Sequence, residues 1–232
     1  GAAFSQTITH LYAAMGEPVI DSGGRARIDT ATGVKVLHFL KNLIEVSPPD
    51  ILTMAWDERI RRFKNGRAAF TYGWGARSYS LESDPSSKVS GQVGYAIPPN
   101  ATGSGARTPF GQWILGLPAN LTPENRARSL EVLEVLMSPA TNEKFGSIGF
   151  ENLHRISADP DAGLSEYQKT CRVIFEEDLI SPGARPDTEN WSAISVILGT
   201  TLHDALLGRN SIKKALQLAQ EQADAITKES AL

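Results

Sequence analysis

A tryptophan with a glycine on each side is the residue of this chain best suited to bind a ligand. Gly73 and Gly75 carry no side chains that could cover the ring of Trp74. The segment 68–72 before them is short, apolar and uncharged, which predicts a buried strand of a parallel sheet. Ligands of open α/β sheets bind at the carboxyl ends of the strands, so Trp74 would lie where a ligand binds. Its flat ring suits the apolar face of a small molecule, above all a sugar, although a core tryptophan is the alternative.

Other residues that could bind or catalyse form no recognisable catalytic or metal-binding set. Arg77 and Arg155 could hold hydroxyl or anionic groups through two hydrogen bonds each, but ion pairing is the simpler expectation. No G-x-S-x-G motif occurs, and no pair of carboxylates is singled out as acid and base. We therefore expect no catalytic residue, no metal and no cofactor. The histidines lack metal-binding spacing, and they are His10, His38, His154 and His203.

Composition describes an ordinary globular chain and excludes several classes. The 232 residues are 41% hydrophobic and 21% charged, enough to bury a substantial core. A net charge of −3 argues against nucleic acid as a partner, because phosphate binding needs a clustered basic surface. Cys171 is the only cysteine, so the sequence excludes an intramolecular disulfide. No run approaches the roughly 18 apolar residues of a transmembrane helix.

Apolar residues recur at helical spacing through most of the chain, so helices should dominate an α/β fold. A strong helix should begin at Asp29 or Thr30 and end before Pro48. Thr122-Pro123-Glu124 predicts another helix start, and Gly66 stands where a helix C-cap needs a left-handed residue. The first of these helices should bury Val34, Leu37, Leu40, Leu43 and Ile44. Further helices are expected at about 4–15, 57–64, 138–148, 164–176, 188–207 and 211–228, and strands at 68–72, 92–97 and 110–117.

The order of several short motifs is similar to a known family. Residues 63–70 (FKNGRAAF), followed by Trp74, are similar to a segment written F-x-x-G-x-A-A-M and the aromatic residue after it. Further similar segments follow in the same order, at 93–98, 110–118, 133–139 and 191–218. Taken together they resemble the C-terminal portion of extracellular solute-binding proteins of the maltose-binding type, which are the carbohydrate-binding components of bacterial ABC importers. Each motif alone is weakly specific, whereas their order and spacing cover nearly the whole chain.

The resemblance implies a two-lobe, periplasmic-binding-protein-like (type II) α/β fold that is rich in helix. Family members begin with strand-helix repeats that precede anything in this sequence. We therefore expect the chain to lack most of the N-terminal lobe, as a truncated form, a proteolytic product or part of a longer chain would. This expectation leaves apolar faces of the first-lobe segment uncovered. The expected segments are 1–98 in the second lobe, 99–108 as a hinge, 109–149 in the first lobe, 150–154 as a hinge, and 155–232 as second-lobe helices.

The resemblance also implies a function and a set of binding residues. Such a protein binds a sugar or related polyol in a cleft between its lobes and presents it to the permease subunits in the membrane, from the periplasm or the cell exterior. A carbohydrate-active enzyme is the first alternative, and it would need two carboxylates about 5 to 9.5 Å apart across the pocket. A module that binds partners through exposed helices is the second. The ligand-binding residues expected by analogy are Gly73, Trp74, Gly111, Gln112, Trp113, Arg155, Asn190 and Trp191.

Overall fold

A computed structural model describes residues 2–101, 108–109, 115–141, 144, 166–177, 180–181, 186 and 188–229. The chain divides into two compact units, each assembled from segments distant in the sequence. The first unit comprises Gly1–Arg59, Ile97–Gly111 and Ile174–Leu232, and the second comprises Ile60–Ala96 and Gln112–Val173. The expected division into lobe and hinge segments stays a prediction.

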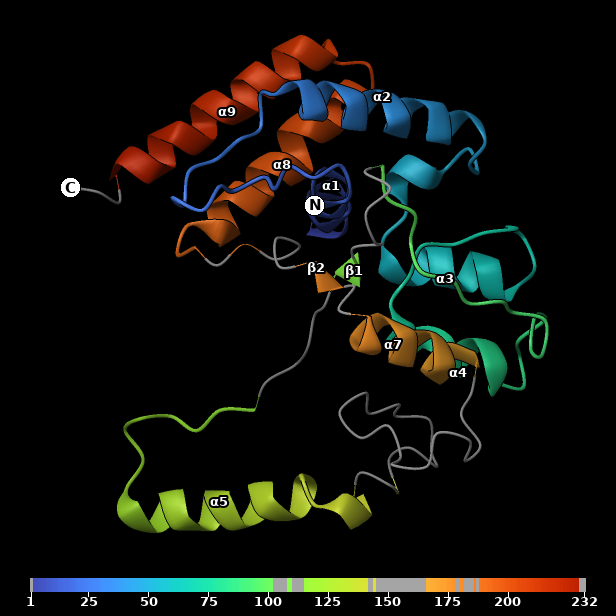
Figure 1. The fold of residues 1–232 in the computed structure, drawn as a ribbon, viewed down its shortest axis with the longest axis vertical. Coiled ribbons are helices and arrows are strands. Elements are labelled where there is room, and N and C mark those ends of the chain that lie inside the picture. Colours follow the sequence, from blue (N-terminus) through green and yellow to red (C-terminus); the bar gives the residue numbers. More distant parts are fainter. Residues whose placement is uncertain are drawn as a thin grey trace. The chain divides into compact units, whose positions relative to one another are not determined.

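The first unit is a bundle of four helices around one hydrophobic core. Helices α8 (Trp191–Leu206) and α9 (Ile212–Glu229) lie side by side, and α1 (Ala2–Ala14) and α2 (Ala31–Glu45) pack against them (Figure 1). These four confirm the predicted helices. The helix η1 (Ile51–Thr53) follows α2. The fully buried large side chains of the core are Ile8, Tyr12, Val19, Ile28, Val36, Leu37, Ile194, Leu198, Leu202 and Leu216.

Helix α2 begins where its cap predicts but buries a different face. The Thr30 hydroxyl accepts a hydrogen bond from the Gly33 amide at 3.2 Å, which confirms the predicted N-cap. A Cβ on Gly33 would overlap the Tyr12 hydroxyl and lie 2.9 Å from Leu216 Cδ2, so α1 and α9 press on this glycine. The buried face is therefore centred on Gly33. The predicted face was wrong at Val34 and Leu43, which are exposed, and the observed one is Thr32, Gly33, Val36, Leu37 and Leu40.

Helices also make up most of the regular structure that the described residues of the second unit form. Helix α3 (Trp56–Lys64) enters the unit at Ile60, and η2 (Gly75–Arg77) leads directly into α4 (Ser78–Glu82). Helix α5 (Pro123–Leu136) begins at its predicted cap, where the Thr122 hydroxyl accepts from the Asn125 amide at 3.3 Å. Helix α7 (Glu166–Glu176) contributes most of its length to this unit. Several apolar side chains of α5 are exposed, namely Leu130, Val132, Val135 and Leu136.

The predicted strands are not present in the described residues. Segments 68–72 and 92–97 are irregular, as is 115–117, while the start of the third predicted strand lies outside the described residues. A strand is held by hydrogen bonds to a neighbouring strand, and no such partner lies beside 68–72 in the described part of the chain. Phe70 is 92% exposed, so this run is not a buried strand. The strands that the described residues do form are β1 (Thr108–Pro109) and β2 (Ile180–Ser181), a short parallel pair.

Candidate functional site

Trp74 lies at the end of an irregular loop between α3 and η2. The loop begins at Gly66, whose φ of 69° confirms the predicted left-handed C-cap of α3. Trp74 is the N-cap residue of η2, and 41% of its surface is exposed. A fully buried core tryptophan is therefore excluded. Tyr72, which the predicted buried strand 68–72 includes, is 40% exposed, so its predicted burial was wrong.

The two glycines beside Trp74 are explained by close contacts. A Cβ on Gly73 would lie 2.8 Å from Ile60 Cδ1 of α3. A Cβ on Gly75 would overlap the hydroxyl and ring carbons of Tyr167 from α7. The sequence suggested that the glycines leave the indole uncovered. The structure adds that side chains of α3 and α7 approach the backbone on either side of Trp74, so that a Cβ at either glycine would force Ile60 or Tyr167 to shift.

A small polar network anchors Tyr95, whose ring packs beside Tyr167, the residue that lies against Gly75. The rings of Tyr95 and Tyr167 lie 5.7 Å apart, centroid to centroid. The Tyr95 hydroxyl donates to Glu82 Oε1 at 3.2 Å, and the Gly91 amide donates to Glu82 Oε2 at 2.9 Å. Glu82, at the end of α4, thereby ties the loop after it to the aromatic pair. Sequence reasoning missed Tyr95 and Tyr167, and its sole indirect signal was the glycine at 75.

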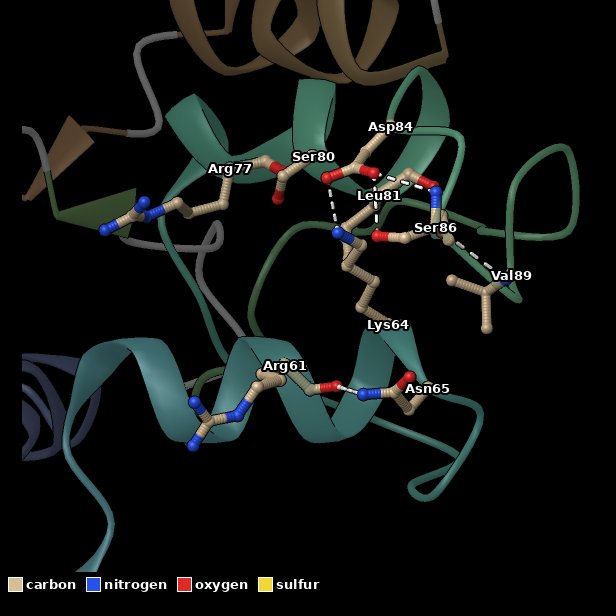
Figure 2. Close-up of polar contacts among 10 residues, drawn as sticks. Arg61, Lys64, Asn65, Arg77, Ser80, Leu81, Asp84, Ser86 and Val89 are labelled. Carbon is tan, nitrogen blue, oxygen red and sulfur yellow. Dashed lines mark hydrogen bonds and ion pairs between the residues drawn. The ribbon is translucent and has the colours of Figure 1, made fainter.

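A second network joins the end of α3 to the loop that follows α4. Lys64 Nζ donates to Asp84 Oδ2 at 2.5 Å, while the hydroxyl and amide of Ser86 donate to Asp84 Oδ1 (Figure 2). The Lys88 amide also donates to the Lys64 carbonyl at 3.0 Å. The hydrogen bond from Lys64, followed by those from Ser86, lowers the pKa of Asp84 to about 2. Both ends of the segment that carries Trp74 are therefore anchored.

Two arginines extend from this region but do not join that network. Figure 2 shows the guanidinium groups of Arg61 and Arg77 pointing away from the pair formed by Lys64 and Asp84. The Arg77 carbonyl accepts a hydrogen bond from the Ser80 hydroxyl at 2.8 Å, which closes the first turn of α4. Its position three residues after Trp74 keeps it a candidate for a hydroxyl or anionic group.

Asn190 and Trp191 belong to the first unit, at the start of α8. Trp191 is the first residue of the helix and is partly buried against the hydrophobic core. Its amide donates to the Thr188 carbonyl at 3.0 Å, and the Asn190 carbonyl accepts from the Ile194 amide at 3.0 Å. These contacts give Trp191 a packing role within its unit. A ligand-binding role for either residue stays a prediction.

The remaining predicted residues divide into those outside the described part and those with structural contacts. Gly111, Gln112, Trp113 and Arg155 lie outside the described residues. His203 Nε2 lies 3.0 Å from the Leu52 carbonyl, and its ring packs edge-on against Phe4. No group of three or more His, Cys, Asp or Glu residues that could hold a metal occurs in the described part of the chain. None of the helices described there is long and apolar enough to span a bilayer.

Comparison with known proteins gives a family and a fold. A model of the bacterial extracellular solute-binding protein family matches residues 1–141. Among solved structures, an ABC transporter solute-binding protein of Agrobacterium radiobacter in complex with ribitol has 24% sequence identity and a TM-score of 0.83. Maltose-bound MalE3 of T. maritima has 23% identity and a TM-score of 0.78, and a solute-binding protein of Agrobacterium vitis with bound D-mannitol has 17% and 0.69.

These likenesses extend over almost all of this chain but only part of the other proteins. The matches cover 97%, 94% and 97% of the chain, and 57%, 56% and 58% of the three solved proteins in the same order. The chain thus spans a little over half the length of the structures that it matches. They confirm the expected type II periplasmic-binding-protein fold, in a helix-rich part of it.

Proposed function

This chain belongs to the bacterial extracellular solute-binding protein family, and we propose that it is part of the component of an ABC importer that binds a sugar or related polyol. The similar structures support this ligand class, since their bound molecules are ribitol, maltose and D-mannitol. All three carry many hydroxyl groups on a carbon skeleton with apolar C–H faces. A site for them combines an aromatic surface with hydrogen-bonding groups.

Trp74 is the observation that carries the proposal. Its ring is partly exposed, and the backbone on its two sides packs against Ile60 at Gly73 and against Tyr167 at Gly75. A ring held in this way loses little conformational freedom when a ligand stacks on it, which favours binding. Gln112 and Arg155 would supply hydrogen bonds to hydroxyl groups, as the family resemblance implies. Stacking and hydrogen bonding suffice for reversible binding, so the proposed role is transport without catalysis.

The proposed transport cycle involves two partners of this chain, the solute that it binds and the permease that receives the solute. The sugar lies between two lobes that close about a hinge, and the permease subunits in the membrane recognise the closed state. The binding component acts in the periplasm or at the cell exterior, where it meets the solute before the permease does. Gly111, Trp113, Asn190 and Trp191 are the candidates for further walls of the cleft.

The test is ligand-induced stabilisation of the complete gene product. Ribitol, D-mannitol and maltose head a panel of sugars and polyols, each added during thermal unfolding. A ligand at about 100 times its Kd stabilises the folded state by about 2.7 kcal/mol, which is a measurable rise in Tm. For the ligand that binds, Trp74→Ala should weaken the affinity by about two- to twelvefold, because stacking on an aromatic ring contributes about 0.5–1.5 kcal/mol.

Phe39→Ala is the matched control, since Phe39 is 46% exposed and lies on α2 of the first unit. Its affinity should equal that of the unaltered protein. If no member of a broad panel raises Tm, the proposed ligand class is wrong. If a ligand binds and Trp74→Ala leaves its affinity unchanged, the ligand class survives and the role of Trp74 does not.

A further inference from the structure

A residue from a helix distant in the sequence packs against the loop that carries Trp74. Tyr167 of α7 places its hydroxyl and ring where a side chain at position 75 would begin. Among the described residues, the glycines with positive φ are Gly16, Gly24, Gly66, Gly91 and Gly208, and Gly75 is not one of them. Its backbone conformation therefore does not require glycine, and the contact with Tyr167 does.

The Tyr167 ring is in turn packed against a second tyrosine of the same unit. The Tyr95 ring lies 5.7 Å from it, and Glu82 accepts the hydrogen bond of the Tyr95 hydroxyl. Glu82 ends α4, the helix that follows Trp74 after one short turn. Two residues that come later in the sequence therefore pack near the loop that carries Trp74: Tyr167 lies against Gly75, and Tyr95 packs beside Tyr167. All of these residues belong to the second unit, so the contacts lie within one compact body.

We propose that Tyr167 is a positioning residue that fixes the orientation of the Trp74 ring by occupying the space beside Gly75. The inference rests on the proposed function in that the positioned ring is the one that stacks on the sugar. Closely packed groups admit few alternative arrangements, so the fit between Tyr167 and Gly75 specifies one path for the backbone on the C-terminal side of Trp74. The fit between Gly73 and Ile60 is more tolerant, because a Cβ at Gly73 would approach one methyl carbon at 2.8 Å, whereas a Cβ at Gly75 would overlap three atoms of Tyr167.

The experiment follows the Trp74 ring directly, with 5-fluorotryptophan in the complete gene product and ¹⁹F NMR. The Trp74 resonance is identified as the one that disappears in Trp74→Phe. Gly75→Ala and Tyr167→Ala should each move or broaden it while the other tryptophan resonances keep their positions. The double variant Gly75→Ala/Tyr167→Ala should return the Trp74 signal toward its original position, since the added methyl group then fits the space that the ring left.

Gly94→Ala is the matched control for the glycine change. Gly94 belongs to the same unit, has no positive φ, and a Cβ there would meet nothing within 4 Å. The Trp74 resonance should be unchanged in this variant. For a sugar that binds, Gly75→Ala and Tyr167→Ala should each weaken the affinity by about five- to tenfold, with partial recovery in the double variant.

The outcomes separate this inference from the proposed function. An unchanged Trp74 resonance in both Gly75→Ala and Tyr167→Ala overturns the positioning role, whether or not sugars bind. A double variant that is no closer to the original signal than Gly75→Ala also overturns it, because the damage is then not the contact with Tyr167. If the Trp74 resonance moves in the single variants and returns in the double variant, but the protein binds no sugar, the positioning role is supported and the proposed ligand class is wrong.

Discussion

Removing the Tyr12 hydroxyl should destabilise the first unit through one defined hydrogen bond. Tyr12 of α1 is fully buried, and its hydroxyl donates to the Ile28 carbonyl at 2.6 Å. Tyr12→Phe keeps the ring in place and leaves that carbonyl without this donor. The hydroxyl also lies where a Cβ of Gly33 would be, so its removal loosens the contact of α1 with α2 as well.

The expected loss follows from the contribution of a buried hydrogen bond. A net hydrogen bond contributes about 1 kcal/mol, and a buried group left without a partner costs about 1–3 kcal/mol. We therefore expect Tyr12→Phe to lower the free energy of unfolding by about 2 kcal/mol. For a chain of this length each kcal/mol corresponds to about 2–4 °C, so Tm should fall by about 4–8 °C.

The assay is urea unfolding followed by circular dichroism, with Tyr79→Phe as the matched control. Tyr79→Phe removes the same hydroxyl group from an exposed residue of α4, and we expect it to lower the free energy of unfolding by less than about 0.5 kcal/mol. Equal losses in the two variants, or a loss below about 0.5 kcal/mol in Tyr12→Phe, would refute the reasoning. Alkaline titration gives an independent check, because burial, followed by Asp29 and Glu17, raises the pKa of Tyr12 above its ordinary value of 10.0. Stability from this group is full below that value and is lost as the pH rises past it.

Two further perturbations test the hydrogen bonds that Gln220 of α9 makes to the segment 26–28, and the network around Asp84. Gln220→Ala removes the bonds of Gln220 to the Ile28 amide at 2.7 Å and the Ala26 carbonyl at 2.9 Å, so unfolding should cost about 2 kcal/mol less. Gln217→Ala on the same helix should change the free energy of unfolding by under about 0.5 kcal/mol. Equal urea midpoints for the two variants would contradict the stabilising role of the Gln220 hydrogen bonds. The lowered pKa of Asp84 stabilises the fold above its ordinary value of 3.8 and ceases to do so as the pH falls toward about 2. The unfolding midpoints of the unaltered protein and Asp84→Asn should therefore converge over that interval, and a constant gap would show that Asp84 is not responsible.

The helices could be predicted because the signals that begin and end them act within a few residues. The hydroxyls of Thr30 and Thr122 each bond an amide three residues ahead, and Gly66 takes the left-handed conformation that ends α3. The buried face of α2 could not be predicted from its own apolar pattern. Tyr12 and Leu216 select it by packing on Gly33, and neither residue is near that glycine in the sequence.

The prediction of strand 68–72 failed for a related reason. An apolar, uncharged run becomes a strand only beside another strand, and the run itself does not state whether one is present. The candidate binding residue that follows this segment, Trp74, was selected because it stands between two glycines. Its partial exposure agrees with a ligand-binding surface, although sugar binding there stays a proposal.

The amino-acid sequence was sufficient to predict most of the longer helices, the caps at Thr30, Gly66 and Thr122, the family, and the residue with the best case for ligand binding. Each of these depends on neighbouring residues or on the order of motifs along the chain. The reason why Trp74 is flanked by glycines required the folded structure, because the side chains of Ile60 and Tyr167 occupy the space beside them. Close packing is set by whichever atoms fill the space in three dimensions, and residues remote in sequence supply most of them.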